Sequence, residues 1–287
     1  DGNISYVQNF GRDFTLTLRG NFTYTANMVK TWEEAFQKYA YQERAGKPYN
    51  YYVGYIALGL FRDEDDVKYS PNQSSIAGRE VLPGDIKYKD VNGDGVITSD
   101  DQVPLSYQAN YPRLMYGFGA EFRWKNLTLG VLFKGTGNVE NYYVNPGNGG
   151  SGYLPFAMGV TGNVLSITTD QSNRWTPREI SGTAATENPN ARFPRLSYGN
   201  DHNSLPQSTF WKTNARYLRL QEINLNYHLG AGNILKAVGV SSLDLQFVAS
   251  NVYVWSPFKL WDPELASSNG GAYPIPARYA FQMYINF

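Results

Sequence analysis

The sequence contains no cysteine, which excludes a disulfide framework and any metal site built on thiolates. The sequence also has no excess of charge of either sign, because 25 Lys and Arg side chains balance 25 Asp and Glu side chains. A general basic surface for binding nucleic acid is therefore not supported. Long apolar runs are also missing. The longest uncharged one, Tyr51 to Phe61, is shorter than the about 20 residues of a membrane-spanning helix. No signal peptide opens the chain, and we expect a longer protein around it.

Side chains suited to catalysis are scarce. The only histidines are His202 and His228, and no G-x-S-x-G motif is present. We interpret Asp63–Asp66 as solvated surface and His202 as a loop residue. The glycine-rich run 147–152 neither follows a strand nor opens a periodic helix, so it gives weak support to a phosphate cradle. The sequence therefore predicts that the protein is not an enzyme.

Aromatic side chains are plentiful at 15% of the chain, with 23 Tyr and 6 Trp. This excess suits a girdle at a membrane interface or loops that stack on sugars. Some aromatics that we expect to be exposed could contact sugar rings, pack against a lid partner, belong to such a girdle or support the loops: Tyr142, Tyr143, Tyr153, Trp175 and Trp211. The residues that bind substrate stay unknown.

The end of the chain alternates apolar and polar side chains. Its apolar face is Tyr279, Phe281, Met283, Ile285 and Phe287. Successive side chains of a strand point to opposite faces, so this pattern predicts a strand with one fully apolar face. Such a terminal strand is typical of bacterial outer-membrane barrels, where lipid-facing and lumen-facing residues alternate over about ten residues. The last strand of a soluble sandwich is the alternative.

Six further segments alternate in the same way. They are residues 3–7, 14–25, 114–124, 127–134, 217–228 and 243–251. A slip in phase near Leu220 and Gln221 indicates a bulge. We expect Glu121, Arg123 and Lys134 on one inner side, where burial in a dry core would cost several kcal/mol unless each charge were paired. A hydrated lumen removes that cost.

The connections alternate in length. Residues 9–11, 125–126 and 230–240 are short, whereas 26–111, 139–212 and 254–276 are long. This alternation predicts short periplasmic turns and long extracellular loops. Within the first long loop we expect a short helix over Thr31–Arg44, and local structure over Tyr51–Phe61 in place of a membrane strand. Because open sheet edges are not tolerated in hydrocarbon, seven strands require partners from a missing N-terminal part or another chain.

The run Asp90–Asp101 matches an EF-hand calcium loop. Asp90, Asn92 and Asp94 take the first, third and fifth positions, and Gly95 takes the sixth. Val96 would offer its carbonyl group, and Asp101 replaces the usual Glu at position twelve. This spacing places oxygen ligands around one point, as Ca²⁺ requires, so we predict a structural calcium site. A solvated Asx/Gly turn is the alternative.

Several motifs together resemble SusC/RagA-type TonB-dependent outer-membrane transporters. The motifs are Gly84–Ile97, Asn173–Pro177, Asn190–Arg195, Tyr217–Leu220 and Asp262–Glu264, with the terminal strand that ends at Phe287. The resemblance covers nearly all of residues 1–287, with 84–103 as an EF-hand-like loop in an extracellular excursion. It implies an all-β, antiparallel transmembrane barrel segment of about seven or eight strands, with long extracellular loops, from the C-terminal part of a larger, ~22-stranded barrel. The plug domain is absent from this chain.

The resemblance also implies active import of oligosaccharides or peptides across the bacterial outer membrane. A SusD-like lipoprotein would form a lid on the loops, and the TonB complex would act through the missing plug segment. A secreted, calcium-dependent glycan-binding β-domain is the alternative, and a surface glycosidase is a more remote one. The sequence does not identify the substrate, the oligomeric state or the reason for the start at Asp1.

Overall fold

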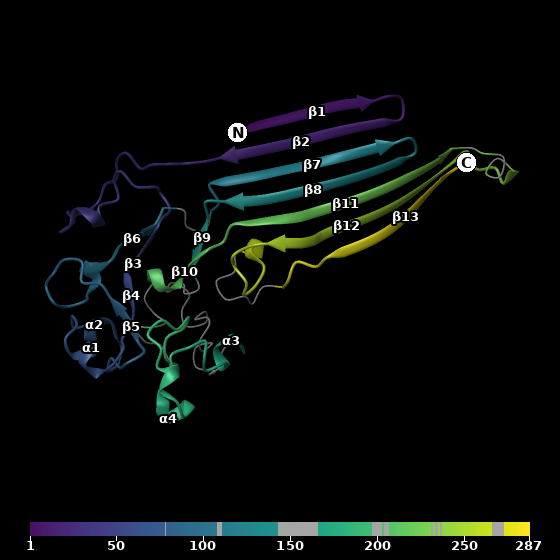
Figure 1. The fold of residues 1–287 in the computed structure, drawn as a ribbon. Coiled ribbons are helices and arrows are strands. Elements are labelled where there is room, and N and C mark those ends of the chain that lie inside the picture. Colours follow the sequence, from purple (N-terminus) through teal and green to yellow (C-terminus); the bar gives the residue numbers. More distant parts are fainter. Residues whose placement is uncertain are drawn as a thin grey trace.

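The computed structural model describes residues 1–77, 79–107, 111–142, 166–196, 203, 207–230, 232, 235, 237–265 and 273–287. Seven strands form one antiparallel sheet in the order β1-β2-β7-β8-β11-β12-β13 (Figure 1). They are β1 (Gly2–Phe10), β2 (Phe14–Tyr24), β7 (Leu114–Trp124), β8 (Leu127–Gly137), β11 (Tyr217–Gly230), β12 (Ser242–Trp255) and β13 (Arg278–Asn286). The predicted all-β class and the seven alternating segments are confirmed.

The sheet has one polar and one apolar face because the strand register places polar residues opposite polar or glycine residues and apolar residues opposite apolar ones. Glu121 lies opposite Thr17 on one side and Gly130 on the other, and Gly130 lies opposite Asn224. On the other face, Phe122 lies opposite Leu16 and Leu129. Residues directly opposite each other share a face, so each alternating strand extends the same two surfaces.

The sheet is open, and its apolar face is uncovered. β1 and β13 form its two edges. On the apolar face, Ile4 is 71% exposed and Phe281 is 70% exposed. A soluble protein rarely leaves so large an apolar surface in water. The open, antiparallel sheet has the form of a barrel segment.

The predicted bulge is confirmed in β11. Leu220 pairs with Phe133 of β8, whereas Glu222 pairs with the adjacent Leu132, so Gln221 is the additional residue. The Gln221 side chain donates a hydrogen bond to Asn251 Oδ1 at 3.2 Å, across to the neighbouring strand. Beyond the bulge, the alternation resumes in the correct phase for both faces.

The long connections gather at one end of the sheet, and the short turns and the C-terminus lie at the other (Figure 1). We call the described parts of residues 25–113 and 138–216 the cap. Its regular elements are short: β3 (Tyr52–Gly54), β4 (Ala57–Leu60), β5 (Ile86–Tyr88), β6 (Val103–Ser106), β9 (Glu140–Tyr142), β10 (Lys212–Asn214), α1 (Glu64–Lys68), α2 (Ser74–Ala77), α3 (Ser166–Thr169) and α4 (Arg178–Ser181).

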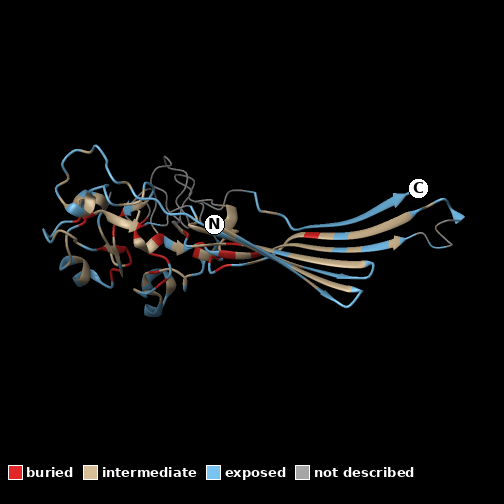
Figure 2. Ribbon diagram, turned by 90° about the horizontal axis from the view of Figure 1, so that it is seen from above, coloured by how far each residue is buried: buried red, intermediate tan, exposed pale blue. Residues whose placement is uncertain are grey.

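The hydrophobic core lies in the cap and not in the sheet, as the buried residues of Figure 2 show. Its buried members are Tyr55, Leu60, Ile86, Tyr88, Ile97, Trp175, Ala191, Phe193 and Trp211. The cap therefore folds around its own apolar residues, while the sheet carries its apolar residues on the outside.

Two predictions about the first long loop have different outcomes. Tyr51–Phe61 forms β3 and β4, which pair with β6 and β5 inside the cap, so its assignment as local structure is confirmed. The helix predicted over Thr31–Arg44 is wrong, since only a 3-10 turn at Ala40–Gln42 forms there. Phe36 is 96% exposed. A helix here would have no buried apolar face, and such packing supplies most helical stability in proteins.

The first turn is shifted from its predicted place. Phe10 pairs with Phe14, so the turn covers residues 11–13 and has Gly11 at a φ of 68°. Among the described residues, no helix is both long and apolar enough to cross a membrane.

Candidate functional site

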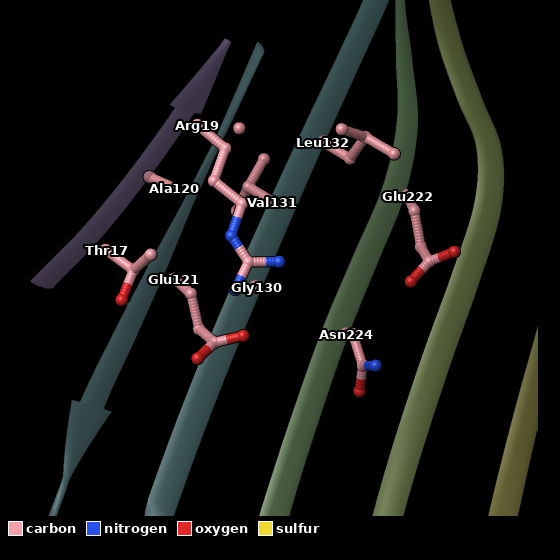
Figure 3. Close-up of a pocket in the computed structure, with 10 residues that line it drawn as sticks. Thr17, Arg19, Ala120, Glu121, Gly130, Val131, Leu132, Glu222 and Asn224 are labelled. Carbon is pink, nitrogen blue, oxygen red and sulfur yellow. The ribbon is translucent and has the colours of Figure 1, made fainter. Parts of the chain in front are cut away.

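The polar face of the sheet contains a depression of about 240 Å³. Its lining includes Thr17, Arg19, Gly119, Glu121, Gly130, Glu222 and Asn224 from four adjacent strands (Figure 3). Gly119 and Gly130 leave space beside positively and negatively charged side chains and the amide of Asn224. Glu121, Arg123 and Lys134 share this face through the register, as predicted. The surface suits a water-filled passage for polar solutes and shows no arrangement of nucleophile and base.

An ion network joins this polar face to the connection between β12 and β13. Arg219 of β11 is only 2% exposed, and its Nη2 lies 2.6 Å from both Asp262 oxygens. Its Nε lies 3.0 Å from Glu264 Oε2, at ion-pair distance although outside hydrogen-bond geometry. Lys134 Nζ reaches Glu264 Oε1 at 2.5 Å. The network fixes the connection between β12 and β13 to the sheet, and it brings Tyr217–Leu220 and Asp262–Glu264 together.

The predicted calcium loop adopts a tight conformation held by its own side chains. Asp90 accepts hydrogen bonds from Gly93 N at 2.6 Å and Gly95 N at 2.8 Å, and Asp94 accepts one from Val96 N at 3.0 Å. The hydrogen bond from the Gly95 N–H is the main reason that the pKa of Asp90 is lowered. These bonds curve the backbone around the side chains at positions one to seven.

Asp101 closes this loop from its far end. It is fully buried, and it accepts hydrogen bonds from Val91 N at 2.7 Å and Thr98 N at 2.8 Å. Its carboxyl group also lies within hydrogen-bonding range of Asp90. Each carboxylate oxygen keeps a second lone pair, so the bonds to N–H groups leave acceptor capacity for a cation.

The loop therefore fits the chemistry of Ca²⁺ in part. Among the described residues, no three His, Cys, Asp or Glu side chains converge as a metal site. The predicted donor set differs from such a cluster because it includes the Asn92 amide and the Val96 carbonyl. The assignment of Asp90, Asn92, Asp94, Val96 and Asp101 as ligands stays a prediction.

Three motif segments meet inside the cap at Gly84. Gly84 N donates to Phe61 O at 2.8 Å, and Gly84 O accepts from Arg195 N at 2.9 Å. The Trp175 ring lies directly over Gly84, and Trp175 N donates to Phe193 O at 3.0 Å. These segments therefore contribute to the core of the cap.

Two of the aromatics expected to be exposed are buried. Trp175 is 4% and Trp211 is 1% exposed. Trp211 Nε1 donates to Asn203 O at 2.8 Å, so burial serves packing and a hydrogen bond in the cap. Tyr142 ends β9, and nothing can be said of its side chain. Tyr143, Tyr153, His202 and the run 147–152 lie outside the described residues.

The other candidate groups have structural roles. His228 Nδ1 lies 2.7 Å from Asp244 Oδ1 across two strands of the polar face. Asp63 caps α1 by accepting from Asp66 N at 2.8 Å, and Asp66 pairs with Lys87 at 2.9 Å. Each of these groups therefore has a structural contact within the fold.

No protein-family model matches the chain. Two curated proteins of Formosa agariphila are similar to it. TonB-dependent receptor P26 is 26% identical over 82% of this chain and 22% of its own length, and TonB-dependent receptor P39 is 20% identical over 91% of this chain and 26% of its own length. The chain thus spans about a quarter of the length of the curated relatives that it matches.

Solved structures of a RagAB peptide transporter share the fold. One matches 99% of this chain and 28% of its own length with a TM-score of 0.64 and 18% identity. The RagAB peptide importer in the "closed-closed" state matches 99% of this chain and 29% of its own with a TM-score of 0.67 and 18% identity. The resemblance to SusC/RagA-type TonB-dependent transporters is confirmed by these matches, and the named relatives are receptors and transporters.

Proposed function

We propose that this chain is part of the wall and extracellular cap of a TonB-dependent importer in the bacterial outer membrane. The observation that carries the proposal is the two-faced sheet, apolar and uncovered on one side and polar on the other, with the hydrophobic core outside it in the cap. Lipid would cover the apolar face and water would fill the space beside the polar face. Both strand edges would pair within a larger barrel.

The remaining parts of the machine lie outside this chain. In this proposal, a SusD-like lipoprotein closes over the cap, and the TonB complex supplies energy through a plug segment elsewhere in the protein. Similarity to a protein named as a peptide transporter supports peptides as cargo. Oligosaccharides are the other predicted class.

Spin labels provide a direct test, and residues 1–287 contain no native cysteine that would compete for the label. Single cysteines at Leu18, Phe122 and Phe247 would face lipid, and those at the adjacent Thr17, Glu121 and Gln246 would face water. In the full-length protein in lipid nanodiscs, we expect the first set to collide preferentially with oxygen and the second with a water-soluble nickel chelate.

Because the two positions of each neighbouring pair lie at nearly the same depth in the bilayer, a difference in accessibility between them reports the face and not the depth. Equal accessibility on both faces, or an isolated full-length protein that is monodisperse without detergent, would contradict the barrel. The latter result would favour a secreted glycan-binding β-domain.

We also propose that Ca²⁺ braces the cap at Asp90–Asp101, with Asp90, Asn92, Asp94, Val96 and Asp101 as ligands. The support is the ligand spacing together with the fold of the loop, in which Asp90 and Asp101, from opposite ends, both accept hydrogen bonds from backbone N–H groups of the loop. The calcium loop is also joined to the N-terminal part of the same long connection, because Lys38 Nζ lies 2.9 Å from Asp100 Oδ2.

Replacing Asp90 and Asp94 with Asn should abolish this calcium binding, since a hard cation requires charged oxygen ligands. Isothermal titration of the full-length protein with Ca²⁺ measures the effect. The control replaces the nearby Glu64 and Asp65 with Gln and Asn, which removes two acidic charges from the surface of α1. Retained affinity in the Asp90 and Asp94 variant would show that the loop is only a turn.

A further inference from the structure

A groove of about 430 Å³ lies on the apolar face, at the end of the sheet that carries the cap. Its lining includes Tyr116, Leu218 and Trp255. Tyr116 lies opposite Gly135, Gly135 opposite Leu218, and Leu218 opposite Trp255. Residues directly opposite one another share a face, so all these positions belong to the surface that carries Phe122 and Phe247.

Gly135, which is buried beneath Tyr116, lets this ring lie flat against the sheet beside the groove. The Tyr116 ring lies across this glycine so closely that an added Cβ would be 2.5 Å from the ring. Further along the same face, Trp255 contacts Phe133 with ring centroids 6.4 Å apart, and Phe133 stacks on Phe118 at 5.0 Å. The groove therefore continues into a strip of aromatic rings along the strands.

Two cations, Arg216 and Lys259, lie at the cap end of the groove. Both are exposed. Ser256 fixes their backbones together, because its Oγ donates to Arg216 O at 2.8 Å and accepts from Phe258 N at 3.1 Å. Phe258 is buried and contacts the Trp261 ring, which anchors the segment that carries Lys259.

Neither cation has a carboxylate partner within the ranges that the structure describes. This distinguishes the pair from the Arg219 network on the opposite face. Cations next to an apolar groove match a ligand that has an anionic head and hydrocarbon chains. A free anion would make no contact with the aromatic strip, and an apolar peptide would make no ionic contact with the two cations.

We propose that this groove binds an anionic phosphorylated lipid of the outer leaflet. Acyl chains lie along the aromatic strip, and the phosphate contacts Arg216 and Lys259. The inference rests on the proposed function, since the cap end of the apolar face meets the outer leaflet only if the sheet is a wall of an outer-membrane barrel. The rings at this level then also serve as interface anchors.

The test replaces Arg216 and Lys259 with Gln in the full-length protein. Its matched control replaces Arg12 and Lys125 with Gln, which removes two exposed cations at the short-turn end of the sheet. Native mass spectrometry in detergent measures binding of bisphosphorylated lipid A, with dephosphorylated lipid A, phosphatidylethanolamine and inorganic phosphate as competitors. We expect affinity for the bisphosphorylated lipid to fall roughly tenfold or more in the groove variant and to be unchanged in the control.

Four results would overturn the inference while the barrel stands: equal lipid affinity in wild type and groove variant, an equal loss in the control, equal binding of dephosphorylated lipid, or competition by inorganic phosphate as strong as by the lipid. The last result would indicate an anion site without lipid. Absence of the wild-type protein from the outer-membrane fraction would instead overturn the proposed function, and the lipid site with it.

Discussion

Replacing Arg219 with Leu is expected to destabilise the protein by about 1–3 kcal/mol, the cost of leaving partly buried acidic groups without their partner. Asp262 would lose two contacts of 2.6 Å, and Glu264 would lose one of its two ion-pair partners and keep Lys134. The connection between β12 and β13 should detach from the wall. Urea unfolding of the full-length protein in detergent, followed by the loss of its heat-modifiable migration in gels, would measure the change.

Two variants separate this charge effect from general damage. Arg123→Leu removes an exposed arginine from the same polar face and should cost well under 1 kcal/mol, as for other surface substitutions. Changing Arg219, Asp262 and Glu264 together to Leu removes both signs of charge and should restore most of the stability, since apolar replacements of buried ion pairs are often neutral. A triple variant as unstable as Arg219→Leu would contradict the assigned role.

Replacing Gly84 with Ala should cost about 3 kcal/mol or more and loosen the cap. An added Cβ would lie 2.2 Å from the Trp175 ring, and a φ of +85° adds strain for any L side chain. Overpacking typically costs about 1–3 kcal/mol, and the left-handed conformation adds about 1–2 kcal/mol. Limited proteolysis of the full-length protein, with cleavage mapped to residues 25–113 and 166–196, would report the loss.

Gly46 provides the matched control. Its φ of +79° is similar, but no atom lies within 4 Å of an added Cβ. Gly46→Ala should therefore show only the backbone strain, about 1–2 kcal/mol. Equal protease sensitivity in the two variants would mean that the contact with Trp175 is not what requires glycine at position 84.

The sequence predicts the strands well because apolar and polar side chains alternate along each strand according to the face on which they lie. In β2, Leu16 and Leu18 alternate with Thr17 and Arg19, and this local pattern needs no knowledge of neighbouring strands. The bulge at Gln221 is visible for the same reason, since one extra residue reverses the phase. The helix over Thr31–Arg44 fails because local composition does not show whether an apolar face will find a partner.

The motif segments show the opposite case. Gly84, Trp175 and Arg195 are far apart in the chain, and nothing local to any of them indicates that they pack together. The same holds for Arg219 with Asp262 and for the cations beside Trp255. The burial of Trp175 and Trp211, which the sequence predicts to be exposed, also follows from these distant contacts.

By itself, the sequence determined the alternating strands, which face of each is apolar, and a loop with calcium-ligand spacing. The tertiary structure alone decided where the core lies, which charges are paired and which apolar surface has cations at its rim. The physical reason is that alternation is set by the geometry of a single strand, whereas burial and ion pairing depend on long-range contacts between segments that no local pattern encodes.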